Sequence, residues 1–192
     1  MGAAVAWRGF AGPTARGQGR KPLSLRTGRG AWSEGQFVME QPTIRQATPE
    51  DAADLAVLLD RFDGAGATPE QVGARMEASA HVLTTYIAEV DGTMAGFACL
   101  RLVPHLQGDA PYAELTDLYV DPPFRRRGVA RALMTEVERV ALAAGADEIV
   151  VITGFENDGA QDTYHAQGYS RWAQAMRKCF AGMTEDGRCR ER

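Results

Sequence analysis

The stretch that decides the fold covers residues 112–133 and reads YAELTDLYVDPPFRRRGVARAL. Its first nine residues predict a strand, which Asp121-Pro122-Pro123 ends because proline has no N–H group to give to a sheet. From there on, apolar residues recur at helical spacing and face a core, at Val129, Leu133, Val137 and Val140. The stretch therefore predicts a strand, a basic turn and a helix.

The turn between this strand and this helix reads Arg125-Arg126-Arg127-Gly128-Val129-Ala130. The first backbone N–H groups of a helix have no partner within the helix, and the helix dipole places partial positive charge on them. Gly128 lets a ligand approach this backbone closely, and arginine side chains match the geometry of phosphate. We therefore predict a phosphate site made by the three arginines and by the amides of Val129, Ala130 and Arg131. The alternative is a solvated arginine run.

The residues on both sides of this stretch predict a mixed α/β sheet. Before residue 112 we expect a strand at 43–47 and two helices, which begin at Thr48-Pro49 and at Thr68-Pro69-Glu70-Gln71. We also expect a hairpin, in which strands 82–90 and 93–103 are joined by Asp91-Gly92. After the stretch we expect a strand at 148–153, a helix at 157–167 and one or two closing strands within 169–180. The strand 112–120, its helix and the strand 148–153 form a βαβ unit, whose crossover is right-handed.

Other site classes are excluded by the motifs that the chain lacks. It has no Gly-Lys-Ser/Thr of a Walker loop, and no Gly-x-Gly-x-x-Gly follows its first predicted strand. Its three cysteines, Cys99, Cys179 and Cys189, are odd in number and lack metal-ligand spacing. We therefore expect no metal site, and a reducing, cytoplasmic compartment.

Charge divides the 192 residues into an extension and a domain. Residues 1–38 hold six Lys or Arg residues against one Glu and eight of the 21 glycines, whereas the rest of the chain has a net charge of −9. We expect 1–38 to be a disordered basic extension, or a stretch upstream of a true start at Met39. A transit peptide and a nucleic-acid-binding arm are the alternatives. Residues 39–182 are expected to form one domain and 183–192 a frayed tail.

Two motifs resemble those of a known family. Arg125-x-x-Gly128-x-Ala130, which follows a strand and opens a helix, resembles the acyl-CoA pyrophosphate motif of the GNAT superfamily of N-acetyltransferases, Gln/Arg-x-x-Gly-x-Gly/Ala. Asn157-x-x-Ala160-x-x-x-Tyr164, followed by Gly168-Tyr169, resembles the family's later motif. The resemblance covers about residues 43–180. It implies a mixed, mostly antiparallel sheet, flanked by helices, in which two central parallel strands splay apart.

The resemblance also implies a donor, acetyl-CoA, bound between the splayed strands 112–120 and 148–153. The end of the first strand would offer backbone groups to the pantetheine and an N–H to the thioester oxygen, at Leu118, Tyr119 and Val120. Asn157 would contact the pantetheine arm, and Tyr164 would donate a proton to the departing sulfur. From the residues alone, Asn157 is also a good helix N-cap and Tyr164 an ordinary core tyrosine.

The group that takes the proton from the amine has three candidates. Some family members carry a glutamate at the position of Glu114, which deprotonates the amine through water. Asp117 lies three residues later, so we expect it on the opposite face of the strand and treat the two as alternatives. His105, on the loop before the strand, is the third candidate. Each carboxylate could instead be an ordinary hydrogen-bonded or solvent-facing strand residue.

We therefore expect an N-acetyltransferase in which a primary amine attacks the thioester of acetyl-CoA directly. The segments without family motifs, about 49–80 and 104–111, are expected to bind the acceptor, a small molecule or a peptide. The acidic domain favours a cationic acceptor and disfavours a nucleic-acid partner. The alternative is a non-catalytic sensor that binds acyl-CoA. We expect a monomer or homodimer and no membrane partner, because no apolar run approaches the roughly 18–20 residues of a membrane span.

Overall fold

The computed structural model describes residues 41–64, 66–106, 108–182 and 184. The predicted extension, 1–38, lies outside the described residues, and so does the predicted tail, 183–192, apart from Thr184. Both therefore stay predictions. No helix within the described ranges is long and apolar enough to cross a membrane.

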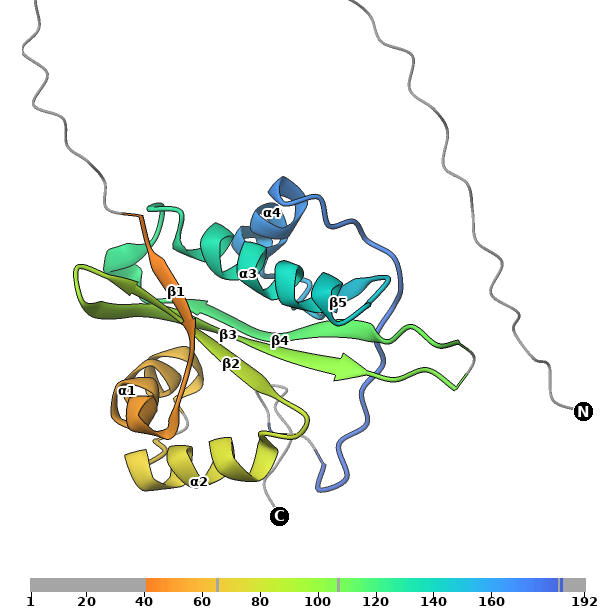
Figure 1. Cartoon of the computed structure of the whole chain (residues 1–192). Coiled ribbons are helices and arrows are strands. Elements are labelled where there is room, and N and C mark those ends of the chain that lie inside the picture. The colour runs from red at the N-terminus through yellow and green to blue at the C-terminus, as the bar shows by residue number, and fades with distance from the viewer. Residues whose placement is uncertain (1–40, 65, 107, 183, 185–192) are drawn as a thin grey trace, which may run out of the picture. The chain divides into compact units, whose positions relative to one another are not determined.

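A five-stranded sheet with the order β1-β2-β3-β4-β5 organises the domain (Figure 1). Neighbours from β1 to β4 pair antiparallel, and β4 and β5 run parallel. The strands are β1 Thr43–Gln46, β2 Thr84–Val90, β3 Thr93–Val103, β4 Tyr112–Val120 and β5 Ile149–Val151. The predicted mixed, mostly antiparallel sheet is confirmed, and β4 has the predicted bounds.

Helices cover both faces of this sheet (Figure 1). α1 Ala52–Asp63 and α2 Pro69–Ser79 lie on one face, and α3 Val129–Ala143 and α4 Asp158–Ala166 lie on the other. Two 3₁₀ turns, η1 Pro49–Asp51 and η2 Pro122–Phe124, precede α1 and follow β4. β4, α3 and β5 form the predicted βαβ unit.

Each face of the sheet has its own core. Successive strand residues point to opposite faces, so Leu100 of β3 packs with α3, whereas Phe97 packs with α1 and α2. The apolar stripe of α3 is fully buried, as its helical spacing predicts, at Val129, Leu133, Met134 and Val137. The two cores fix β3 and β4 between two helical layers.

Local sequence signals produce the predicted cap and hairpin. The Oγ1 atom of Thr68 accepts a hydrogen bond from the N–H of Gln71 at 3.3 Å, and the Oε1 atom of Gln71 accepts one from the N–H of Thr68 at 3.0 Å. Asp91 and Gly92 have φ angles of 52° and 72°, both positive, as a two-residue hairpin turn of this kind requires. The helix expected to start after Thr48 begins later, at Ala52, because the residues between them, Pro49–Asp51, form the 3₁₀ turn η1.

β4 contains a β-bulge at Thr116. Neighbouring residues of β3 pair with Leu115 and Asp117, which leaves Thr116 between them without a partner in that strand. A bulge adds one residue to a strand, so the alternation of side chains is reversed beyond it. Leu118 consequently packs against the same core as Leu115, three residues before it.

The pairing of β4 with β5 is short. It joins Ala113, Glu114 and Leu115 to Ile149–Val151. The strand expected at 148–153 therefore ends early, and Ile152 is largely exposed. Because β4 continues to Val120, its last five residues lie beyond this pairing.

The closing strands expected within 169–180 were wrong, because the structure has no strand between these residues. This stretch contains none of the β-branched residues that favour extended pairing. Its bulky residues, such as Trp172 and Met176, are spaced among small and charged ones. Both side chains are largely exposed.

An ion-pair network joins the first elements of the domain. The guanidinium of Arg45 donates to both carboxylate oxygens of Asp51, at 2.6 and 2.8 Å, and contacts Glu89 at 2.8 Å. The backbone N–H of Thr48 also donates to Asp51, at 2.7 Å. These hydrogen bonds, that of Arg45 above all, lower the pKa of Asp51 from an ordinary 3.8 to about 2.

The lowered pKa of Asp51 predicts how the stability of the fold depends on pH. Because the pKa of Asp51 is lower in the folded chain, its stabilising contribution is complete above about pH 4 and is lost as the pH falls towards 2. We expect Asp51→Asn to be less stable than wild type at pH 7, with the difference in melting temperature narrowing between pH 4 and 2. Melting curves across this range check it, and a constant difference would contradict it.

Candidate active site

The loop after β4 leaves the first turn of α3 open to a ligand. Gly128 is the N-cap of α3 and has a φ of 81°, in the left-handed region that glycine adopts without a steric penalty. No side chain caps this helix end, and its first turn contains no acidic residue. The first amides of α3, at Val129, Ala130 and Arg131, therefore keep the free donors and partial positive charge that suit an anion.

The three arginines of the loop have different surroundings. The Nε atom of Arg125 donates to the carbonyl oxygen of Val120 at 2.9 Å, and its guanidinium lies 5.9 Å from the ring centre of Tyr119. The guanidinium of Arg127 lies 5.6 Å from the ring centre of Phe124 and 3.6 Å from a carboxylate oxygen of Asp91. Two of the arginines thus brace the loop against its neighbours, and the third, Arg126, is exposed with a φ of 64°.

The backbone at the end of β4 is held close to β3. Gly96 pairs with Val120, and a Cβ atom on Gly96 would lie 2.4 Å from the carbonyl oxygen of Tyr119. Such a contact is far too short, so this close approach requires glycine. Leu118, Tyr119 and Val120, the predicted backbone contacts of the pantetheine, therefore belong to a rigid part of the sheet.

A pocket of about 210 Å³ opens where β4 and β5 stop pairing. Its lining combines two charged side chains, a bulge residue and apolar side chains, at Arg101, Glu114, Leu115, Thr116, Val150 and Ile152. Glu114 therefore lies at the splayed region where the acyl donor was expected. Sequence reasoning did not predict Arg101 as part of this site.

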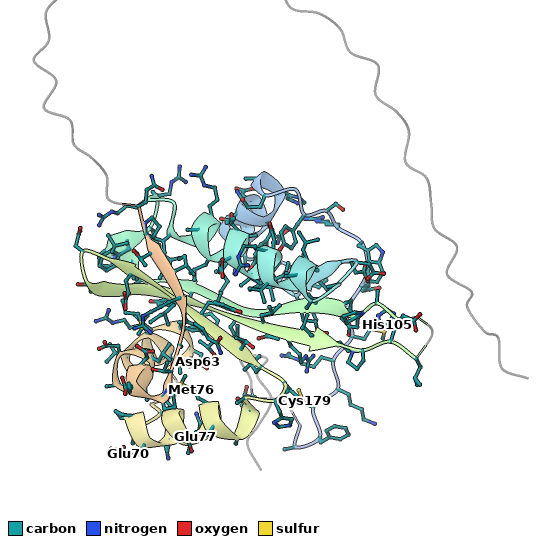
Figure 2. All side chains as sticks on the ribbon, viewed as in Figure 1. Asp63, Glu70, Met76, Glu77, His105 and Cys179 are labelled. Carbon is teal, nitrogen blue, oxygen red and sulfur yellow. The ribbon has the colours of Figure 1, made fainter. Side chains whose placement is uncertain are left out.

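Glu114 is held in place by two neighbours. The Nε atom of Arg101 donates to its Oε2 atom at 2.8 Å, and the hydroxyl of Tyr112 donates to its Oε1 atom at 3.0 Å. His105, which Figure 2 shows beyond the sheet on the β3–β4 loop, packs its ring against Tyr112 with centres 5.0 Å apart. The carboxylate retains partial exposure, with 20% of its side-chain surface accessible.

Glu114 and Asp117 point to the same face of the sheet, and the expectation of opposite faces was wrong. Their partners in β3 are Arg101 and Cys99, which are two residues apart and so share a face. The cause is the bulge at Thr116, whose hydroxyl also donates to Asp117 at 2.9 Å. Two carboxylates are thus presented on one face.

Cys99 lies behind Asp117 and is chemically inert. Its thiol is buried, and burial raises its pKa to about 12. The thiolate is the nucleophilic form of cysteine, so this residue stays unreactive at neutral pH. Cys99 is therefore unsuited to carry an acyl group.

Tyr164 lies on α4 and is half-buried against the core that α3 covers. Its ring centre is 5.8 Å from that of Tyr169. Burial, with a smaller contribution from the charge of Asp117, raises the pKa of Tyr164, so its phenol holds a proton at neutral pH. Asn157 caps α4, accepting a hydrogen bond from the N–H of Ala160 at 3.3 Å. The contacts of both residues with a donor stay predictions.

One ion pair next to this site was missed by sequence reasoning. Asp121 was taken only as the end of the strand, yet it is buried and pairs with Arg61 of α1 at 2.6 Å. These residues are 60 positions apart, so no local pattern reports the pair.

Comparisons with known proteins agree on one family. Residues 53–169 match the model of the acetyltransferase (GNAT) family. The chain is 32% identical over 137 residues to an aminoglycoside N(6′)-acetyltransferase type 1 of Stenotrophomonas maltophilia, covering 69% of this chain and 89% of the relative. It is 30% identical over 133 residues to a mycothiol acetyltransferase of Kineococcus radiotolerans, covering 68% of this chain and 42% of the relative.

A solved structure gives the same result. An aminoglycoside N-acetyltransferase in complex with CoA is 25% identical and superposes with a TM-score of 0.64, covering 72% of this chain and 93% of that one. Together with the sheet, the glycine-capped α3 and the pocket between β4 and β5, these matches identify the chemistry. The chain belongs to the GNAT family of acetyltransferases, and acetyl-CoA is the acyl donor of its reaction.

Proposed function

We propose that the chain acetylates a cationic primary amine that enters the pocket between β4 and β5, and that Glu114 takes the proton from this amine. The observation that carries the proposal is that Glu114 lines the pocket at the end of the β4–β5 pairing. Asp117 on the same face adds a second negative charge. Two carboxylates on one face favour a positively charged acceptor.

The donor side fits a pyrophosphate through the backbone. The amides at the start of α3 follow a glycine cap, the first turn of the helix has no acidic residue, and no side chain caps it. We assign the pyrophosphate to these amides, with Arg126 adding charge from the exposed side of the loop. The pantetheine arm would follow the edge of β4 at Leu118–Val120, opposite Asn157 and Tyr164 of α4.

The proton balance of the reaction can be assigned to these side chains. The ammonium of the acceptor gives one proton to Glu114, directly or through water, and the free amine attacks the thioester carbonyl carbon. The carbon–sulfur bond breaks, Tyr164 gives its proton to the sulfur, and the second proton lost from nitrogen returns to Tyr164. Because the Cys99 thiol is buried and protonated, direct transfer in a ternary complex is favoured over an acyl-enzyme.

Aminoglycosides are the first acceptors to test. Two relatives are named for aminoglycoside acetylation, and aminoglycosides carry several primary ammonium groups that suit paired carboxylates. α1 and α2, on the face to which Glu114 and Asp117 point, would form the acceptor side.

The proposal is tested by CoA release from acetyl-CoA with a panel of primary amines. We expect wild type to turn over at least one cationic amine, and Glu114→Gln to lower kcat/KM by about 10²-fold and flatten the acid limb of its pH profile. Asp117→Asn is the matched control, and the acid limb of its pH profile should resemble that of wild type. The reverse pattern would assign the base to Asp117, and donor binding without any turnover would indicate the sensor instead.

The donor site is tested by Gly128→Glu. The new carboxylate at the start of α3 opposes the helix dipole and the pyrophosphate, so we expect the Kd for acetyl-CoA to rise by about 100-fold or more. Gly145→Glu controls for backbone strain, because Gly145 after α3 has a φ of 80° and open space like Gly128. Calorimetric titration compares the two variants, and equal affinities would refute the assignment.

The proton donor is tested by Tyr164→Phe. Loss of the hydroxyl leaves the sulfur without this proton, so we expect kcat to fall by roughly 10²-fold while the Kd for acetyl-CoA changes little. Tyr169→Phe removes the hydroxyl of the neighbouring tyrosine and should leave kcat at the wild-type value. Full activity of Tyr164→Phe would show that the leaving sulfur gains its proton elsewhere.

A further inference from the structure

We propose that Arg61 of α1 is a positioning residue for donor binding, which acts by holding the buried carboxylate of Asp121 at the start of the donor-binding loop. The proposal deepens the proposed function and rests on its assignment of the donor to the loop before α3. Arg61 is 60 residues away from Asp121 in sequence and belongs to the opposite layer of the fold from α3.

Asp121 is the residue at which the sheet becomes the donor-binding loop. Its N–H donates to the carbonyl oxygen of Ala95 in β3 at 2.9 Å, and its carbonyl oxygen accepts from the N–H of Phe124 in η2 at 2.9 Å. A displacement of Asp121 would therefore move η2 and the residues that follow it. The backbone of Asp121 sets where the loop begins.

The side chain of Asp121 needs its partners. It is 4% exposed, its Oδ2 atom lies 2.6 Å from an Nη1 atom of Arg61, and its Oδ1 atom accepts from the hydroxyl of Tyr119 at 3.3 Å. A buried carboxylate that loses its cation is left with an uncompensated charge, which favours movement towards water or protonation. Removing Arg61 therefore acts on the position of Asp121 as well as on stability.

α1 is well placed to provide this support. Phe62, next to Arg61, packs its ring against Phe97 and Tyr119, with centres 5.9 and 5.6 Å apart. The end of α1 is thus fixed on β3 and β4 by apolar contacts that do not depend on the ion pair. Arg61 reaches Asp121 from an anchored helix end.

The same contacts continue into the loop. Tyr119, which donates to Asp121, also lies under the guanidinium of Arg125, and Arg125 in turn holds the carbonyl oxygen of Val120. A continuous set of contacts therefore runs from Arg61 to the backbone at the end of β4. The edge of β4, one end of the proposed donor site, belongs to this set, and Arg125 lies in the loop that leads to the start of α3.

The test compares Arg61→Gln with Arg45→Gln in the full chain. Arg45 also lies 2.6 Å from a buried aspartate, Asp51, and the exposures of the two pairs are similar, but its network joins β1, η1 and β2. We expect both variants to lower the melting temperature. Only Arg61→Gln should raise the Kd for acetyl-CoA, by about tenfold, because misplaced binding groups weaken a preformed site. Arg61→Lys, which keeps the cation, should recover most of the affinity.

The outcomes separate this proposal from the donor assignment. An unchanged Kd in folded Arg61→Gln, with Gly128→Glu still impaired, would overturn the role of Arg61 alone. Equal losses of affinity in Arg61→Gln and Arg45→Gln would also overturn it, because general destabilisation would then explain both. If Arg61→Gln does not fold, Asp121→Ala removes the ion pair from its other side, and a wild-type Kd in that variant would overturn the proposal.

Discussion

The site depends on one constraint, which is that β4 pairs with β5 over three residues and is bulged just beyond them, at Thr116. Parallel neighbours would ordinarily continue side by side and satisfy each other's backbone groups. Here the last residues of β4 extend past the end of the pairing, and the pocket lies at that point. The bulge also turns Asp117 to the face of Glu114, so two acidic side chains lie on one face next to this edge.

In our proposal the donor side is made largely of backbone. Gly96 lets β3 approach the end of β4, and Gly128 begins α3 without a competing cap. Side chains such as Arg125 brace this backbone, and in our proposal few of them touch the donor. Such a site can serve different acceptors, because the helices that we assign to the acceptor, α1 and α2, do not contribute its backbone. Among the relatives, one is named for aminoglycoside acetylation and another for mycothiol acetylation.

The parts of this structure that depend on interactions between residues close in sequence could be predicted. The bounds of β4, the glycine start of α3 and the cap at Thr68 follow from proline, glycine and capping side chains a few residues apart. The bulge at Thr116 has no such signal in the sequence, so the face of β4 that we predicted for the side chain of Asp117 was wrong. The partner of Asp121 depends on the packing of α1 against β4, which no local pattern reports. The motifs led to candidate site residues close to them in sequence, and the contacts of these residues with a donor stay predictions. Arg101 and Arg61 carry no such motif, because only tertiary structure brings them to Glu114 and Asp121.

The most direct test of the central claim is amide hydrogen exchange of the full chain, with and without acetyl-CoA. We expect slower exchange in the donor complex at Leu118, Tyr119, Val120 and at the start of α3, because these amides would contact the donor. Amides of β1 and β2, which lie away from the β4–β5 edge of the sheet, should exchange as before. Donor binding with protection elsewhere, and none at the end of β4 or the start of α3, would contradict the account.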